Sequence, residues 1–205
     1  MKKRLILASS SPRRQQLLRE LGINFTVKKP EIDEKSVKRN TPKETVERLA
    51  ARKAQSIAIQ AEDEIILAAD TIVVHEGEIY EKPNNQSEAL EMIRSFSGKT
   101  HEVITAVALR SLEKEAVFSV TTKVEFWPLA EAEMKAYVET DEPYDKAGAY
   151  GIQGLAKIFI KKIDGDYFNV VGLPVSHVVR ELRTFGMDVE PLIFARKQNA
   201  PKTIQ

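Results

Sequence analysis

Three serines, a proline and two arginines follow one another near the start of the chain, in the segment Ser9-Ser10-Ser11-Pro12-Arg13-Arg14. Ser11 suits the N-cap of a helix, and Pro12 suits its first position, where no backbone donor is needed. The free N–H groups of such a helix start, the hydroxyls and both arginines can converge on one point that attracts phosphate. An ordinary strand-to-helix turn with a solvated arginine pair fits the same residues. The segment is not a Walker loop, because it lacks a glycine run and a Gly-Lys-Ser/Thr sequence.

A lone carboxylate, Asp70, interrupts the nearly continuous apolar run 65–74. The run is rich in β-branched residues, which is typical of a strand buried on both faces. Because an unpaired buried carboxylate is costly, we expect Asp70 to face a cleft, a cation or a metal. Asp70 could instead end one strand and cap a turn, but apolar residues on both sides disfavour that alternative. Asp70 is therefore the candidate catalytic residue.

Two lysines are predicted to lie near this carboxylate. Lys53 falls on the apolar stripe of a helix that opens with the capping box 41–44. Its side chain either snorkels past the core or points at a phosphate from the rim of the core. Lys82 follows a hairpin turn at Glu76-Gly77, which brings it back toward the Asp70 end of the sheet.

The elements that must position these residues alternate between the two kinds of secondary structure, which predicts an α/β fold. Hydrophobic periodicity predicts strands over 5–8, 25–28, 65–74, 101–110, 116–126 and 155–163. It predicts helices over 12–21, from 42 onward, 87–96, 130–139 and 174–185. The stretch 141–154 mixes glycine, charge and aromatic residues, which is typical of a functional loop. We expect one domain over 1–190, with two lobes around a cleft, and a polar tail over 191–205.

The overall composition restricts the classes of function. The chain has 205 residues, of which 42% are hydrophobic and 30% are charged, and its net charge of +1 does not suggest a nucleic-acid partner. It contains no cysteine, which excludes disulfides and thiol nucleophiles, and its three histidines lack metal-ligand spacing. A hard, oxygen-bound cation remains compatible. Since no apolar stretch reaches membrane-spanning length and the start lacks a signal-peptide core, we expect a cytoplasmic protein without a membrane partner.

Seven motifs together resemble the Maf family, the septum-formation-associated nucleoside triphosphate pyrophosphatases. They are 8–14 (ASSSPRR), 48–54 (RLAARKA), 69–73 (ADTIV), 81–83 (EKP), 97–101 (SGKTH), 145–154 (DKAGAYGIQG) and 169–174 (NVVGLP). They cover almost the whole chain in order. The resemblance implies an elongated mixed β-sheet flanked by helices, with two lobes around a central cleft, similar to inosine triphosphate pyrophosphatases. It also implies metal-dependent hydrolysis of a nucleoside triphosphate to the monophosphate and pyrophosphate.

The resemblance also implies roles for individual residues. It makes Asp70 the proton acceptor and places the metal beside the acidic turn that ends at Glu34. The residues that match the subfamily acting on dTTP and UTP are Arg13, Thr71 and Gln153. Together with the reasoning from the residues, this gives phosphate-binding candidates Ser9, Ser10, Arg13, Arg14, Lys53 and Lys82. The candidate ligands of a divalent cation, Mg²⁺ or Mn²⁺, are Asp33, Glu34 and Asp70; which carboxylate is the base and which is the ligand stays open.

Two other classes of function compete with this reading. The chain could be a nucleotide-binding regulator of septum formation without essential catalysis, since the family name reflects a role in cell-division arrest. It could also be a nucleic-acid-binding module that uses Arg13 and Arg14, but balanced charge and little interleaving of aromatic and basic residues disfavour this. A carboxylate isolated in an apolar strand beside lysines favours chemistry over binding alone. We expect a nucleoside triphosphate as substrate, a role that includes cleansing of the nucleotide pool, and a homodimer as the assembly to test.

Overall fold

The computed structural model describes residues 3–34 and 41–189, and within them the chain forms one seven-stranded mixed sheet. The strands are β1 (Arg4–Ala8), β2 (Phe25–Lys28), β3 (Glu64–His75), β4 (Glu78–Tyr80), β5 (Thr100–Arg110), β6 (Glu115–Phe126) and β7 (Ile160–Asp164). The α-helices are α1 (Pro12–Glu20), α2 (Pro42–Gln55), α3 (Gln86–Phe96), α4 (Glu131–Val138), α5 (Tyr167–Val171) and α6 (Val175–Thr184). Three 3₁₀ helices are η2 (Pro143–Asp145), η3 (Ala147–Ala149) and η4 (Leu155–Phe159). In these ranges no helix has the length and apolarity needed to cross a membrane.

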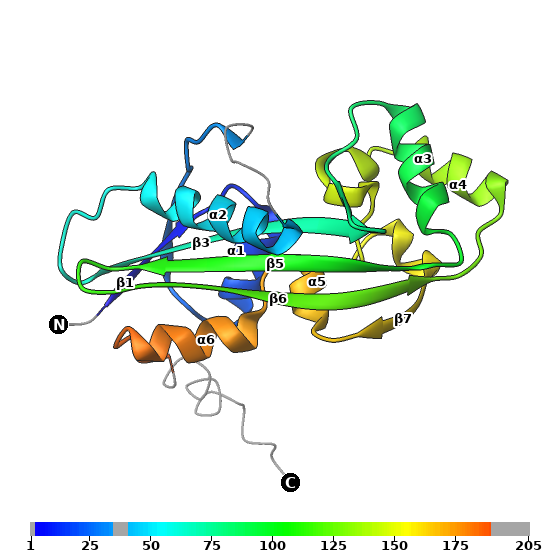
Figure 1. Ribbon diagram of the computed structural model, residues 1–205. Coiled ribbons are helices and arrows are strands. Elements are labelled where there is room, and N and C mark those ends of the chain that lie inside the picture. The colour runs from blue at the N-terminus through cyan, green and yellow to red at the C-terminus, as the bar shows by residue number, and fades with distance from the viewer. Residues whose placement is uncertain (1–2, 35–40, 190–205) are drawn as a thin grey trace, which may run out of the picture.

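Three long antiparallel strands, β3, β5 and β6, run along the whole length of the elongated molecule (Figure 1). The order across the sheet is β2-β1-β3-β5-β6-β7, and β4 pairs with β3 beside this path. Strands β1 and β2 run parallel to each other, and β1 runs parallel to β3. The predicted class, an elongated mixed α/β sheet flanked by helices, is confirmed.

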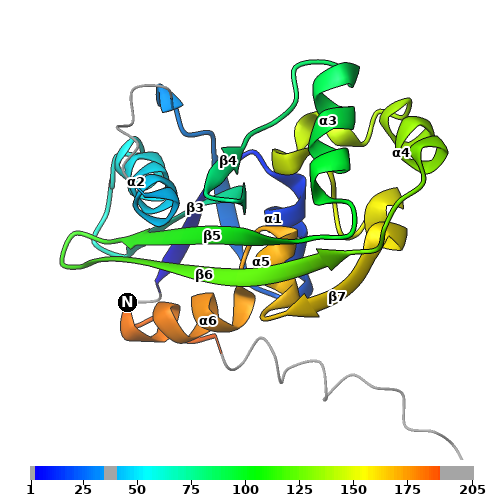
Figure 2. The same ribbon diagram turned by 45° about the vertical axis from the view of Figure 1, so that its right-hand side comes forward.

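The core is divided between two lobes at opposite ends of the long strands. In the first lobe, α1 and α6 pack on one face of the sheet and α2 packs on the other. In the second lobe, α3, α4 and the loop that carries η3 cover the sheet around Phe96 and Phe126. The two views show α2 and α6 at one end of the molecule, and α3 and α4 at the other (Figures 1 and 2).

The helix starts follow their sequence signals. The side chains of Ser11, Thr41 and Asn85 cap α1, α2 and α3 by accepting a hydrogen bond from a backbone N–H three residues later. Proline occupies the first turn of both α1 and α2. The capping box predicted at 41–44 is thus confirmed on its serine/threonine side, and it fixes where α2 begins.

One edge of β3 is bare in the middle of the strand, between the two lobes. Strand β1 pairs with β3 only as far as Ala68, and β4 begins to pair at Val73. Among the described residues, no strand covers this edge between those two positions. Asp70 and Thr71, which lie in the gap, are also the two positions of β3 that are partly exposed. The gap therefore opens the interior of the sheet at the residue that interrupts the apolar run.

The prediction of a strand over 155–163 is wrong in its first half, and the short helix α5 is not predicted at all. Residues Leu155–Phe159 form the 3₁₀ helix η4, and β7 begins only at Ile160. The carboxylate of Glu142, thirteen residues earlier, accepts the N–H groups of Leu155 and Ala156 and so turns the chain before it can extend. Such a long-range contact leaves no trace in local periodicity. The predicted tail 191–205 lies outside the described residues, and the single domain over 1–190 stays a prediction.

Candidate active site

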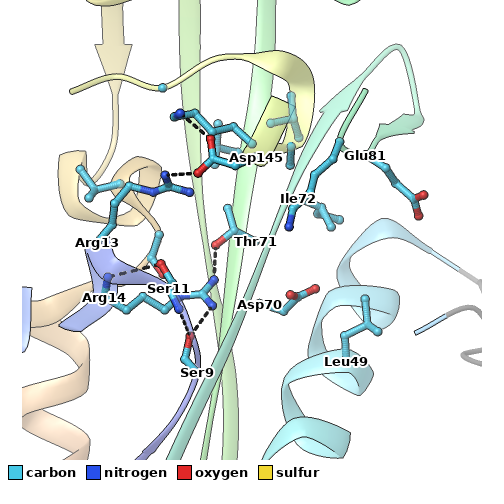
Figure 3. A pocket seen from close by; sticks show the side chains of 18 of the residues that line it. Ser9, Ser11, Arg13, Arg14, Leu49, Asp70, Thr71, Ile72, Glu81 and Asp145 are labelled. Atoms are coloured by element: carbon cyan, nitrogen blue, oxygen red, sulfur yellow. Dashed lines mark hydrogen bonds and ion pairs between the residues drawn. The ribbon is translucent and has the colours of Figure 1, made fainter. Parts of the chain in front are cut away.

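A cleft of about 690 Å³ lies where the sheet is bare. The carboxyl end of β1, the start of α1 and the middle of β3 form one wall, and the loop 145–154 forms another. Figure 3 shows these segments around the labelled side chains of Arg13, Arg14, Asp70 and Thr71. Ligands of open α/β sheets bind beyond the carboxyl ends of strands, at the point where the strand order reverses. The volume is in the range of small-molecule sites.

Strand alternation sends Asp70 and Thr71 to opposite faces of the sheet. Even-numbered neighbours such as Ala68 pack against α2, whereas odd-numbered neighbours such as Ala69 pack in the core with α1 and α6. Asp70 accordingly points toward α2, and Thr71 points toward Arg14 (Figure 3). One strand thus presents a carboxylate on one side of the gap and a hydroxyl on the other.

On the α2 side, Lys53 joins two carboxylates. Its Nζ lies 2.6 Å from Asp70 Oδ1 and 2.8 Å from Glu34 Oε1. The Lys53 and Asp70 side chains are only 12% and 15% exposed, whereas Glu34 is 59% exposed. Lys53 therefore neither snorkels to solvent nor sits in the apolar core, and its ammonium compensates the buried charge of Asp70. Because Asp70 and Glu34 contact the same ammonium, their oxygens can also reach a common cation.

On the other side, Arg14 is held by uncharged oxygen atoms. Its guanidinium donates to the Gly172 carbonyl at 2.8 Å, to Thr71 Oγ1 at 3.0 Å and to Ser9 Oγ at 3.3 Å. Burial lowers the pKa of Arg14, the charge of Asp70 opposes that effect, and the group still remains protonated at neutral pH. Among the residues described, no carboxylate forms an ion pair with Arg14. Within the described part of the chain, this partly buried cation therefore has no counter-anion in contact.

A chain of hydroxyls continues from Arg14 into the second lobe. Thr105 Oγ1 donates its proton to the Asn169 carbonyl at 2.9 Å. The bond between the Thr71 and Thr105 hydroxyls, 2.9 Å long, must then be donated by Thr71. Thr71 thus accepts from Arg14 and donates to Thr105, so both functions of its hydroxyl are occupied.

Arg13 leaves α1 in another direction, toward the loop 145–154. Its Nη1 lies 3.1 Å from Asp145 Oδ2, while Lys146 Nζ lies 2.6 Å from the other oxygen of the same carboxylate. Partial burial opposes ionisation of Asp145, but its hydrogen bonds to Lys146 and Arg13 outweigh that effect and lower its pKa. The two arginines therefore do not converge on one point, as the sequence predicts they would: from the start of α1, Arg14 extends toward Thr71 of β3 and Arg13 extends toward the loop 145–154.

A buried imidazole supports the end of this loop. His101 is 1% exposed, and its Nε2 lies 2.7 Å from the hydroxyl of Tyr150, the residue before Gly151. Burial lowers the pKa of His101 to about 3, so the ring is neutral at physiological pH. The pair fixes the loop from the side of the second core, next to the stacked ring of Phe96.

All but one of the predicted site residues line the cleft. Those that do are Ser9, Ser10, Arg13, Arg14, Glu34, Lys53, Asp70, Thr71, Lys82 and Gln153. Asp33 is exposed and is not part of the lining. Gln153 and Lys82 are exposed within it. The roles of these residues stay predictions.

Sequence reasoning missed two lining residues, Asp145 and Lys146. The composition of the stretch 141–154 predicts a functional loop, but it does not indicate which of its charged residues belongs to the site. The signal that points to them is an adjacent acid and base inside a glycine-rich segment, where no secondary structure demands either residue type.

An α/β sheet that opens at a cluster of cations beside one enclosed carboxylate defines a protein with a site for an anionic, phosphorylated ligand. A sequence model of the family described as Maf-like protein matches residues 4–185, and the chain belongs to this family. The resemblance predicted from the seven motifs is therefore confirmed.

Known relatives agree with this assignment. A dTTP/UTP pyrophosphatase from Halalkalibacterium halodurans is 51% identical over 184 residues, which are 90% of this chain and 97% of the relative. A dTTP/UTP pyrophosphatase from Symbiobacterium thermophilum is 51% identical over 185 residues, which are 90% of this chain and 95% of the relative. The solved structure of the Staphylococcus aureus Ham1 protein is similar with a TM-score of 0.50 and 12% identity, over 89% of this chain and 100% of that one. That likeness concerns the fold alone.

Proposed function

We propose that this chain is a nucleoside triphosphate pyrophosphatase that hydrolyses dTTP and UTP to the monophosphate and pyrophosphate. The observation that carries the proposal is Arg14, a partly buried guanidinium anchored by neutral oxygens and without an ion-pair partner among the described residues. A charge fixed in this way is stabilised when an anion binds. The names of relatives at 51% identity, dTTP/UTP pyrophosphatases, suggest the identity of that anion.

In the proposed reaction, a water molecule attacks the α-phosphorus and pyrophosphate leaves on the opposite side. Asp70 accepts the proton of the attacking water, while the ammonium of Lys53, 2.6 Å away, holds the carboxylate in place. Arg14 and Lys82 border the same cleft and neutralise charge that builds up on the phosphate oxygens. Arg13 adds to this charge once it exchanges Asp145 for phosphate.

The residues present fit a divalent cation such as Mg²⁺ or Mn²⁺. Asp70 and Glu34 would hold it, since both carboxylates contact the Lys53 ammonium and therefore lie close to each other. Mg²⁺ is commonly bound by one or two carboxylates together with substrate phosphates, so the lack of a three-carboxylate cluster within the described ranges is compatible with it. When bound, the cation would withdraw charge from the phosphate oxygens.

Base recognition is proposed for Gln153, which is exposed in the cleft on the glycine-rich loop. Uracil and thymine present an N3–H donor between two carbonyl acceptors, and a glutamine amide can pair with the donor and one acceptor at once. Cytosine presents an acceptor at N3, so it mismatches an amide held in one orientation. Purines are disfavoured by their size.

The test is release of pyrophosphate from a panel of dTTP, UTP, dCTP, dGTP and ATP with Mg²⁺. We expect pyrophosphate and the monophosphate from dTTP and UTP at the highest kcat/KM. Arg14→Gln should lower kcat/KM for every nucleotide alike, because phosphate contacts carry no base information. Arg19→Gln is the matched control, since Arg19 is exposed on the same helix and contacts Gln15.

Three outcomes would contradict the proposal: release of inorganic phosphate, a preference for purines, or nucleotide binding without turnover. The last outcome would favour the nucleotide-binding regulator of septum formation. Should Arg14→Gln prove unstable, Lys82→Gln replaces it, because Lys82 is exposed and its loss leaves the core intact. We also propose a cytoplasmic location, because nucleoside triphosphates are used there. The homodimer stays a prediction, which light scattering of the purified protein would test.

A further inference from the structure

The end of the loop that carries Gln153 is held by the carboxylate of Glu142. Glu142 does not line the cleft; it is partly buried, and its carboxylate lies against Gly154. Its Oε2 accepts the N–H of Leu155 at 2.6 Å, and its Oε1 accepts the N–H of Ala156 at 3.4 Å. Two oxygens of one side chain thus hold the backbone immediately after Gly154.

The carboxylate is itself held in one orientation. The hydroxyl of Tyr137 lies 3.2 Å from Glu142 Oε1 and 3.1 Å from the Ala149 carbonyl, so it links the carboxylate to the middle of the loop 145–154. Burial, followed by the negative charge of Glu142, raises the pKa of Tyr137, which therefore remains a donor. All these partners are N–H or O–H groups, and within the described ranges no lysine or arginine forms an ion pair with the Glu142 side chain.

Two glycines let the loop backbone approach this anchor closely. A Cβ added to Gly154 would lie 2.1 Å from Glu142 Oε1, so only glycine allows the backbone to approach the carboxylate so closely. A Cβ on Gly151 would likewise lie 2.7 Å from Lys146 Cε. Lys146 Nζ in turn donates to the Glu142 carbonyl at 2.6 Å. Gly154 therefore lies against the Glu142 side chain, and Gly151 lies against the Lys146 side chain, which is itself hydrogen-bonded to Glu142.

We propose that Glu142 is a positioning residue for base recognition: by anchoring residues 154–156 it fixes the direction in which Gln153 enters the cleft. This inference rests on the proposed function, in which Gln153 reads the base. A glutamine amide can rotate to satisfy cytosine as well as uracil or thymine. In this proposal, backbone groups of the same loop select one orientation of the amide, and they keep their positions only while Glu142 holds residues 154–156.

The experiment compares kcat/KM for dTTP and dCTP in the wild type, Glu142→Gln and Asp141→Asn. Glu142→Gln keeps the size of the side chain but turns one acceptor into an NH₂ donor that faces N–H or O–H groups. We expect the ratio of kcat/KM for dTTP to that for dCTP to fall by about tenfold, which lies within the usual effect of one unpaired buried polar group. Asp141→Asn removes the same charge one residue earlier at an exposed position, and the ratio should not change.

A merely structural role would lower kcat/KM for both nucleotides by the same factor and leave their ratio unchanged. That result, in a folded Glu142→Gln protein, would overturn the inference. If Glu142→Gln does not fold, Tyr137→Phe replaces it, because only the hydroxyl that orients the carboxylate is lost; an unchanged ratio then overturns the inference equally. A wild type that releases no pyrophosphate from dTTP would instead contradict the proposed function, so the two failures are distinguishable.

Discussion

The Thr71→Val variant tests which role Thr71 has in the cleft. The resemblance to the family connects Thr71 with substrate preference, but its hydroxyl is already engaged by Arg14 at 3.0 Å and by Thr105 at 2.9 Å. Valine keeps the shape and the strand propensity of threonine and removes only the hydroxyl. The substitution therefore isolates the hydrogen bonds.

The expected magnitude follows from what is left unpaired. Arg14 loses one charge-assisted hydrogen bond, worth about 1.5–3 kcal/mol, and Thr105 loses a donor. Since the Arg14 side chain borders the cleft, water can replace part of the lost hydrogen bonding. We therefore expect the free energy of unfolding to fall by about 2 kcal/mol, in the lower part of that range. For a chain of this size that corresponds to a fall of about 4–8 °C in Tm. Because Arg14 also loses its orientation, kcat/KM should fall by about tenfold for every nucleotide alike.

The assays are differential scanning calorimetry and pyrophosphate release from dTTP, UTP and dCTP. Thr71→Ser is the control, because it retains the hydroxyl and should keep most of the stability and the turnover. A Thr71→Val protein with unchanged Tm and an altered preference between dTTP and dCTP would refute the reasoning. It would mean that the Thr71 hydroxyl contacts the base rather than Arg14.

Three further substitutions have defined outcomes. Asp70→Asn should lower turnover of dTTP by at least about 100-fold without loss of fold, measured by pyrophosphate release and circular dichroism; near wild-type turnover would rule out a catalytic role. Asp145→Asn should lower KM for every nucleotide about two- to fivefold, because Arg13 is released from an exposed ion pair worth about 0.2–1 kcal/mol, whereas a raised KM would count against this. His101, neutral when folded because burial lowers its pKa to about 3, takes up a proton near pH 6.5 only when unfolded, so acidification destabilises the protein. From pH 6.5 to pH 5 the wild type should therefore lose about 1.6 kcal/mol more than His101→Gln in the free energy of urea unfolding, and equal losses would exclude His101 as the cause.

Sequence reasoning predicted the features that depend on local patterns. The helix starts at Ser11 and Thr41 followed from capping side chains and proline, whose physics needs only four neighbouring residues. Asp70 was selected because a charge within an apolar strand has few structural explanations. In the structure, Asp70 is one of the two partly exposed residues of β3, and Thr71 is the other. These are cases in which a local rule and the tertiary environment agree.

The remaining features depend on contacts between distant residues. Nothing in the sequence indicates that β1 stops pairing at Ala68 and β4 starts at Val73, yet this gap creates the cleft. The partner of Arg13 is Asp145, 132 residues away, and the helix at 155–159 depends on Glu142. The pairing of Lys53 with Glu34 as well as Asp70 likewise brings three separate segments together. Periodicity cannot report such pairings, since it describes only which face of an element is buried.

The three long strands have a mechanical consequence. Because β3, β5 and β6 pass without interruption from one lobe to the other, the residues that the structure describes contain no hinge segment about which the lobes could rotate as rigid bodies. A change in the width of the cleft has to come from a change in the twist of the sheet, spread over many residue pairs, or from movement of the loops alone. Cutting the chain between the lobes would sever every long strand, so neither half should fold when expressed separately. The strands that line the cleft can therefore move only a little, and the site is largely pre-formed. Selectivity for the substrate must then come mainly from groups that are in place before the substrate binds.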